Sequence, residues 1–263
     1  MFTTTLKKMQ TENLDLVYYY LSVQSGFLEL NQLLDHKLTI IATGTQCLNC
    51  KAAKPIFRQG FCQSCFFESP AVGDWVMRPE LSKAHLGQAD RDLAYETKMQ
   101  LQPHIVYLAL SSHLKVGVTR KSQLPTRWID QGAHQAIPLV EVPNRYLAGV
   151  GEVALKQYFS DKTNWRKMLQ KEAEPVDWES ARNQALAHLP KELEPFIVRN
   201  SDLYKIHFPV LQHPNKVTSL NLKKTPNYSG KLKGIKGQYL IFEDATVFNI
   251  RSNEGQCVTL SVG

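Results

Sequence analysis

The chain has 263 residues, of which 43% are hydrophobic and 21% are charged. This composition excludes a disordered or collagen-like chain and is typical of one large or two small folded domains. The net charge of +7 favours a polyanionic partner such as nucleic acid, because Lys and Arg side chains that neutralise phosphates release condensed counterions. The alternative is that the charge serves solubility alone.

Neither end of the chain suggests a membrane. The first 17 residues carry polar and acidic side chains where a signal peptide has an apolar core. No stretch approaches the ~18 apolar residues that a membrane span needs. We therefore expect a cytoplasmic protein without a membrane partner.

Residues 1–45 are predicted to be an N-terminal β segment. Val17, Tyr19 and Leu21 alternate with other side chains, and LTIIATG at 38–44 is a β-branched run that ends in glycine. A cysteine-rich block at 46–68 follows. The connector at 69–101 is mixed and polar, and its residues 89–100 fit neither the helical nor the strand period.

The cysteine-rich block has the spacing C-x2-C-x11-C-x2-C, formed by Cys47, Cys50, Cys62 and Cys65. Each Cys-x2-Cys turn lets two thiolates point at one centre, and two such turns complete a tetrahedron. We predict a structural zinc ion, closed to water because the protein supplies all four ligands. Lys51, Lys54 and Arg58 lie between the two turns and offset the negative charge of the centre. An iron–sulfur cluster and two redox-active dithiols stay open as alternatives.

Residues 102–172 show a compact α/β pattern. Strands are predicted at 104–110, 115–119 and 136–142, with a helix at 122–131 between the last two. Two more helices are predicted, one at 146–159 that Gly149 and Gly151 weaken and a basic one at 161–171.

The remaining chain is predicted to be a helical linker at 173–200 and a C-terminal β segment at 201–263. Asp177 is the expected cap of a helix at 177–189. Strands are predicted at 236–242, 246–250 and 257–262, with a hairpin turn at 252–255 before the last of them. Because β segments occur at both ends, we expect them to pair into one β-rich module that encloses the middle of the chain.

The segments HIVYLAL-SSH-LKVGVTR, PTRWIDQGA and GEVALKQYF resemble the GIY-YIG nuclease superfamily over roughly residues 102–170. More narrowly, the whole chain resembles an uncharacterised bacterial family, a domain of unknown function, that pairs a four-cysteine knuckle with this core and includes the GIKGQYLIF segment at 234–242. The resemblance implies an α+β fold with a small three-stranded GIY-YIG-like core, a zinc knuckle and the β-rich module.

The resemblance also implies a set of catalytic positions, namely Tyr107, Lys115, Arg127 and Glu152. Lys115 stands where the superfamily usually has a second tyrosine. A divalent ion, Mg²⁺ or Mn²⁺, at Glu152 would offset charge at the leaving oxygen, and the Arg127 fork would stabilise the equatorial phosphate oxygens. Tyr107 or Lys115 would assist proton transfer, Lys115 only if its pKa were depressed.

Basic and aromatic side chains around this core are predicted to contact nucleic acid: Arg120, Lys121, Arg127, Trp128, Arg166 and Lys167. Trp128 beside Arg127 suits stacking on a base, although a tryptophan there equally suits anchoring the helix to the core. Residues 161–171 suit a phosphate-facing surface, or a solvated face with Trp165 and Met168 turned inward.

Together these features predict a protein that binds DNA or RNA, and in the stronger version of the hypothesis a metal-dependent phosphodiesterase similar to an endonuclease. The alternative is a non-catalytic, zinc-stapled interaction scaffold with a degenerate GIY-YIG-like fold. A third, weaker option is an enzyme of small-molecule or tRNA modification. The sequence has neither a Walker loop nor a Rossmann glycine fingerprint.

Overall fold

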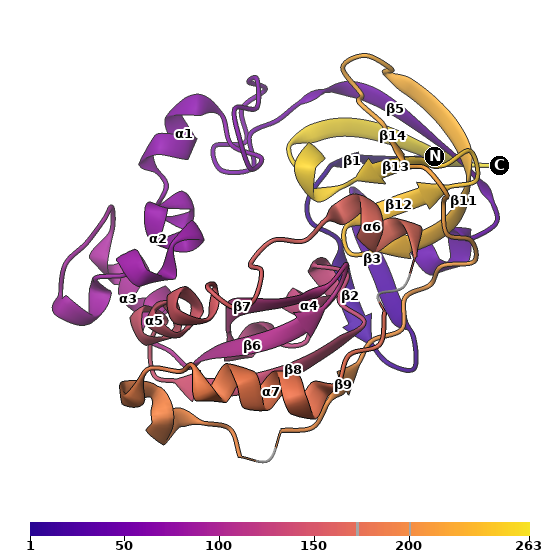
Figure 1. Ribbon diagram of the computed structural model, residues 1–263. Helices are drawn as coiled ribbons and strands as arrows, with labels where there is room; N and C mark the ends of the chain where they lie inside the picture. The colour runs from indigo at the N-terminus through magenta and orange to yellow at the C-terminus, as the bar shows by residue number, and fades with distance from the viewer. Residues whose placement is uncertain (172–173, 200) are drawn as a thin grey trace.

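The computed structural model describes residues 1–171, 174–199 and 201–263 (Figure 1). These residues form three β-sheets and a set of short helices, which confirms the mixed α+β class. The strands are β1 (Phe2–Thr5), β2 (Gln10–Asn13), β3 (Val17–Val23), β4 (Gly26–Glu29), β5 (Lys37–Thr45), β6 (His104–Leu110), β7 (Leu114–Arg120), β8 (Gln135–Val142), β9 (Tyr204–Lys205), β10 (Thr218–Ser219), β11 (Asn227–Lys236), β12 (Tyr239–Phe242), β13 (Thr246–Asn249) and β14 (Gln256–Val262).

The helices are short and lie mostly in the middle of the chain. The α-helices are α1 (Gln63–Glu68), α2 (Asp74–Met77), α3 (Leu93–Gln100), α4 (Thr126–Asp130), α5 (Arg145–Leu155), α6 (Trp165–Gln170) and α7 (Trp178–Ala187). The 3₁₀-helices are η1 (Leu30–Leu33), η2 (Pro70–Val72), η3 (Pro79–Leu81), η4 (Ala84–Leu86), η5 (Lys121–Gln123), η6 (Lys191–Phe196) and η7 (Arg251–Asn253). None of the helices in the described part of the chain is long and apolar enough to cross a membrane.

Strands from both ends of the chain pair in one seven-stranded sheet, ordered β1-β14-β5-β11-β12-β13-β10. The two termini lie beside each other at one end of this sheet (Figure 1). Strand β5 lies between β14 and β11 and is antiparallel to both. The remaining N-terminal strands form a separate sheet, β2-β3-β4, in which alternate residues of β3 are buried, as the sequence pattern predicts.

Two details of the C-terminal prediction were wrong. The run at 236–242 is not one strand, because Gly237 adopts a positive φ of 62° and turns the chain between β11 and β12. Residues 252–255 do not close a hairpin, since β13 pairs with β12 and β10 whereas β14 pairs with β1 and β5. The turn at 252–255 was recognised and the turn at Gly237 was not, and the partner of each strand is set by the tertiary fold.

The third sheet has the order β7-β6-β8-β9 and contains the three strands predicted for the core. The two-residue β9 adds a fourth strand. All seven residues of β6 are buried, because its two faces pack on different hydrophobic clusters. Tyr107 belongs to the cluster shared with the two other sheets, and its neighbours Val106 and Leu108 pack toward α5 and α7.

Helix α5 packs on this sheet and against η3. An ideal Cβ on Gly149 would lie 2.2 Å from the backbone nitrogen of Glu80. The glycine that lowers helix propensity therefore permits a backbone-to-backbone approach. Helix α7 begins after Asp177, whose side chain accepts a hydrogen bond from the Ser180 amide at 3.1 Å, as predicted.

The predicted helices at 122–131 and 161–171 are shorter than expected, and α1, α2 and α3 were not predicted. Residues 122–131 contain only α4 of α-helix, and residues 161–171 only α6, which Asn164 caps. Helix α3 lies in the polar segment 89–100 and has no apolar face, because it buries the polar Glu96 and Gln100. The Glu96 carboxylate accepts the backbone amides of residues 90–92. The predicted domain boundaries at 172/173 and at 200 fall on positions outside the described residues.

Candidate functional site

The four cysteines are positioned by two tight local turns. The amide of Lys51 donates to the Cys47 carbonyl at 3.0 Å and closes the first turn. Cys62 precedes the first turn of α1, so that Cys65 lies on that helix facing the same centre. Gly60 has φ 78°, and an ideal Cβ there would lie 2.5 Å from Leu48 Cδ1. A glycine is therefore required where the two turns approach each other.

The sulfur atoms form a cluster that fits a tetrahedral zinc ion. All four lie within 4.8 Å of one another, and the Sγ atoms of Cys50 and Cys62 are 3.9 Å apart. Zinc–sulfur bonds near 2.3 Å place tetrahedral sulfurs ~3.8 Å apart. The Cys62 amide also donates to Cys47 Sγ at 3.3 Å, a contact that stabilises a thiolate. Elsewhere in residues 1–171, 174–199 and 201–263, no other group of three or more Cys, His, Asp or Glu side chains is close enough to hold a metal ion.

The zinc knuckle (residues 46–66) is attached to the seven-stranded sheet. The Gln46 amide donates to the Gly255 carbonyl at 2.8 Å. A Cβ on Gly255 would lie 2.7 Å from Ile56 Cδ1, so the knuckle packs closely on the connection between β13 and β14. The segment that carries the four cysteines therefore forms one wall of a neighbouring cleft.

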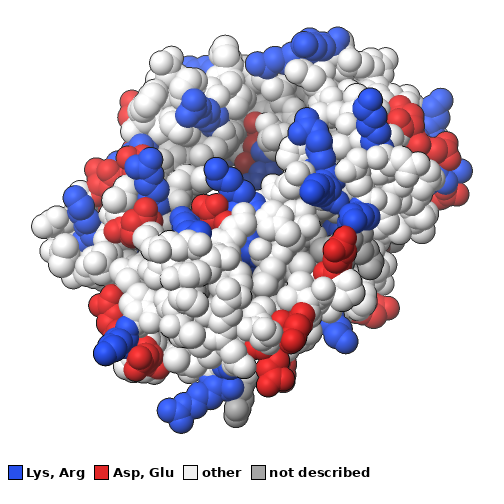
Figure 2. Space-filling model, in the orientation of Figure 1, with Lys and Arg blue, Asp and Glu red and all other residues white. Residues whose placement is uncertain are grey.

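A cleft of about 980 Å³ runs between the zinc knuckle, α2, the four-stranded sheet with α4, α6 and the C-terminal strands. Figure 2 shows a hollow near the middle of this face, with basic side chains on its floor and along its rim. The cleft is lined by six basic residues, which are Lys8, Lys115, Arg120, Arg127, Arg145 and Arg251. Two acidic residues also line it, Asp130 and Glu254.

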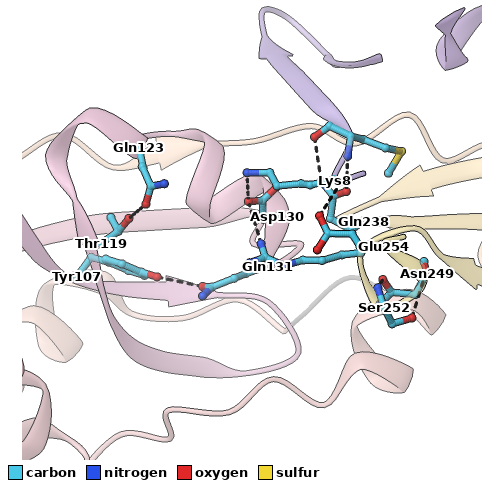
Figure 3. Close-up of polar contacts among 12 residues, drawn as sticks. Lys8, Tyr107, Thr119, Gln123, Asp130, Gln131, Gln238, Asn249, Ser252 and Glu254 are labelled. Carbon is cyan, nitrogen blue, oxygen red and sulfur yellow. Dashed lines mark hydrogen bonds and ion pairs between the residues drawn. The ribbon is translucent and has the colours of Figure 1, made fainter. Parts of the chain in front are cut away.

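Asp130 is already neutralised by its neighbours (Figure 3). Its carboxylate is 2.6 Å from Lys8 Nζ and 3.8 Å from an Arg251 nitrogen. It also accepts a hydrogen bond from Gln238 Nε2 at 2.9 Å. Glu254 accepts the Lys8 backbone amide at 2.9 Å. The cleft therefore has an excess of positive charge that its own acids do not balance.

Lys115 and Arg127 line the cleft, whereas Tyr107 is fully buried beside them and does not line it. The Tyr107 hydroxyl donates to Gln131 Oε1 at 3.1 Å (Figure 3). Burial raises the pKa of Tyr107, and the nearby Arg127 guanidinium opposes the rise. Across the strand pair, Gly117 lies opposite Tyr107, and a Cβ there would be 2.7 Å from the phenol oxygen. The glycine therefore makes room for the tyrosine ring.

Lys115 is almost completely buried, with 4% of its surface exposed, yet it lines the cleft. Burial, together with the positive charge of Arg127, lowers the pKa of Lys115 to about 8, against the opposing charges of Glu152 and Asp161. A lysine with such a pKa exchanges a proton near neutral pH.

Glu152 is close enough to Tyr107 and Lys115 to act on them electrostatically, but it does not line the cleft. Its charge acts on Tyr107 and Lys115, but its carboxylate pairs with Lys156 at 3.5 Å. Burial raises the pKa of Glu152, and Lys156 and Arg145 oppose the rise. The described residues provide no cluster of acidic ligands for Mg²⁺ or Mn²⁺ around it.

The residues predicted to contact nucleic acid are separated by the structure. Arg120 and Arg127 line the cleft, whereas Lys121 pairs with Glu141 at 2.8 Å outside its lining. Trp128 is fully buried against Tyr107 and Tyr204, which fits the core-anchoring interpretation. On α6, whose residue 165 reaches the cleft, Arg166 and Lys167 are exposed.

Three cleft residues were not recognised in the sequence. Arg145 donates to the carbonyls of Trp75 and Val76, at 2.9 and 2.8 Å, and so joins α5 to α2. An arginine in the first turn of a helix is unfavourable for the helix dipole, which is the signal that could have identified it. Tyr239 and Arg251 lie more than 100 residues from Arg127 in the chain, and no local pattern connects them to the core.

A family model described as a protein of unknown function, DUF2797, matches residues 35–258. The match covers most of the chain, including the four cysteines and nearly all of the cleft. No curated protein and no solved structure matched the chain.

Proposed function

This chain belongs to the DUF2797 family, and we propose that it binds nucleic acid, DNA or RNA, in the cleft beside the zinc knuckle. The observation that carries the proposal is the charge of the cleft. Six Lys and Arg side chains line it against two acids, and one of these acids, Asp130, is neutralised by Lys8 and Arg251. A cleft with an excess of positive charge attracts a polyanion and gains from counterion release.

A GIY-YIG-like core is part of this proposal. Strand β6 lies between antiparallel β7 and β8, α4 follows β7, and α5 follows β8. Tyr107, Lys115 and Arg127 face the same side of this unit, and the guanidinium of Arg127 is close enough to act on both of the others. Arg127 is thus the side chain best placed to hold a phosphate oxygen beside a proton-transferring group.

Phosphodiester cleavage is the stronger version of the proposal. In this version, Glu152 would have to leave Lys156 and turn toward the cleft to hold Mg²⁺ or Mn²⁺, and the ion would supply positive charge at the leaving oxygen. Lys115, with its pKa at about 8, would accept or return the proton of the attacking group. Arg127 would orient the phosphate.

Two observations favour binding without cleavage. The Glu152 carboxylate is engaged by Lys156 at 3.5 Å, and Lys115 replaces the usual tyrosine. The alternative is a non-catalytic scaffold, in which the degenerate core and the β-rich flank dock a protein and show no salt-sensitive affinity for nucleic acid.

Binding is tested by measuring affinity for single-stranded and duplex oligonucleotides over a series of salt concentrations. The expected result is an affinity that falls steeply with salt. Arg127→Ala should lower the slope of log affinity against log salt by about 0.7 to 0.9, the effect of one lost phosphate contact. Arg199→Ala, an exposed arginine outside the cleft lining, is the matched control. A flat salt dependence in the wild type would eliminate the nucleic-acid proposal in favour of a scaffold.

Cleavage is tested separately with the same oligonucleotides and either Mg²⁺ or Mn²⁺. If the stronger version holds, the wild type cuts them, and Glu152→Gln retains binding and folding but loses cutting. Intact substrates with both ions, together with salt-sensitive binding, would leave binding as the function and reject catalysis.

A further inference from the structure

A pair of stacked aromatic rings lies in the wall of the cleft. The rings of Trp165 on α6 and Tyr239 on β12 have centroids 5.6 Å apart and an interplanar angle of 9°. Both side chains line the cleft and both are partly exposed. The two residues come from distant parts of the chain, so the sequence offered no sign of the pair.

An arginine side chain lies over the ring of Trp165. The guanidinium of Arg166 lies 4.3 Å from the Trp165 ring centroid, and Arg166 is an exposed side chain. An exposed arginine side chain over an aromatic ring covers a surface on which another flat π system, such as a base, can stack. When it moves aside, its guanidinium is free to pair with a phosphate next to the stacked group.

The aromatic pair is tied to the strand that carries Lys115. The Val116 amide donates to the Ser160 carbonyl at 2.9 Å, and Lys115 and Ser160 form a parallel β-bridge. Closer to α6, the Asn164 amide donates to Ser112 Oγ at 3.0 Å. These contacts hold the beginning of α6 beside the basic side chains of the cleft.

We infer that Trp165 and Tyr239 form a stacking platform for an unpaired base, so that the cleft takes a single strand in preference to a duplex. The inference rests on the proposed nucleic-acid binding and specifies its substrate class. In a duplex, both faces of each base are covered by neighbouring bases, whereas a single strand offers free base faces to aromatic side chains. The cleft then combines a sequence-tolerant aromatic contact with phosphate contacts from Arg166 and Arg127.

The test compares fluorescence anisotropy of a short labelled oligonucleotide, alone and annealed to its complement, at one fixed salt concentration. Wild type should bind the single strand more tightly. Trp165→Leu should weaken single-strand binding by a factor on the order of ten to a hundred, the range for one lost base–aromatic stack, and should change duplex binding less than twofold. Tyr239→Leu should act in the same direction. Trp165→Phe and Tyr239→Phe keep a flat ring and should stay within about threefold of wild type.

Three outcomes overturn the inference. Equal affinity of the wild type for single strand and duplex would do so, as would a Trp165→Leu variant that loses both equally or neither. In each case, salt-sensitive binding that Arg127→Ala weakens would leave the proposed function standing. Absence of binding to either form would remove the proposed function itself. Circular dichroism melting of each variant shows whether a loss of affinity reflects unfolding.

Discussion

The zinc knuckle and the cleft beside it are built in opposite ways. The knuckle takes its four ligands from a single stretch, Cys47 to Cys65. The cleft takes its lining from Lys8 to Glu254, nearly the whole length of the chain. A cysteine cluster made by local turns can be recognised from the spacing of four residues. A charged cleft made by three sheets and several short helices exists only when the tertiary fold is complete.

The two regions also differ in the interactions that stabilise them. Few hydrophobic residues support the knuckle, whose buried cluster consists of three cysteines with Ile56 and Phe61. The cleft face rests on a large cluster shared by all three sheets. We therefore expect the stability of the knuckle to depend on its metal. The stability of the cleft should depend on hydrophobic packing and on the charged side chains that this packing buries.

Removal of zinc should have the largest effect. Structural zinc sites contribute about 10–16 kcal/mol of binding free energy at neutral pH, so Cys62→Ser should abolish stoichiometric zinc and expose residues 46–66 to limited proteolysis. Cys257→Ser, which alters a cysteine outside the cluster, should keep one equivalent. The measurements are elemental analysis and proteolytic mapping. A wild type with less than one equivalent of any transition metal would contradict the metal centre. Proteolysis of residues 46–66 in Cys62→Ser that leaves the sheets intact would show that only the knuckle depends on the metal.

The next largest effect concerns Lys115, the buried cation of the cleft. Its pKa is lowered from 10.5 to about 8, chiefly by burial, so the folded protein holds this proton less tightly than the unfolded chain does. Charging Lys115 therefore costs stability below about pH 8, and the cost disappears as pH rises to 10.5. Lys115→Met should raise the unfolding free energy by about 1–3 kcal/mol at neutral pH.

Urea denaturation at a series of pH values measures this. The advantage of Lys115→Met over wild type should shrink between about pH 8 and 10.5. Lys191→Met, an exposed lysine on η6, should show no such trend. A destabilised Lys115→Met variant at neutral pH would mean that the ammonium is fully compensated inside the cleft.

Gly60 offers a smaller, local test of the knuckle. Its positive φ and the close approach of Leu48 leave no room for a side chain. Gly60→Ala should therefore cost about 1–3 kcal/mol and weaken zinc retention against a chelator. Gly87→Ala is the control, since its φ is also positive but no atom lies within 4 Å of the added carbon. Equal effects of the two variants would show that backbone strain, and not contact with Leu48, is the cause.

The smallest expected effect is at the cap of α6. Asn164 Oδ1 accepts the Lys167 amide at 3.2 Å, and Asn164→Ala should cost about 1 kcal/mol. Because this cap positions the first turn, single-strand affinity should fall slightly while zinc content stays unchanged. Asn164→Asp preserves the cap and should behave like wild type in thermal melting. A loss of zinc in Asn164→Ala would show that the zinc knuckle depends on the cleft, and would contradict the view that the two regions are stabilised independently.

Much of the core was predictable because its signals are local. The strands at 104–110, 115–119 and 136–142 are recognisable as short apolar runs between turns, and their observed bounds differ by at most one residue. The missed helix α3 shows the limit of such patterns. It buries Glu96, whose carboxylate is satisfied by backbone amides, so the usual apolar periodicity is absent.

For the candidate site, the sequence alone determined the cluster of four cysteines, the central strands and the general basic charge, because spacing, periodicity and composition are local properties of the sequence. Only the tertiary structure decided that Trp128 is buried while Trp165 is exposed to the cleft, and that Lys115 shares a cleft with Tyr239 and Arg251. Whether a side chain is buried, and which distant residues share a cleft, depends on which segments pack together. This packing is determined by the fold of the whole chain.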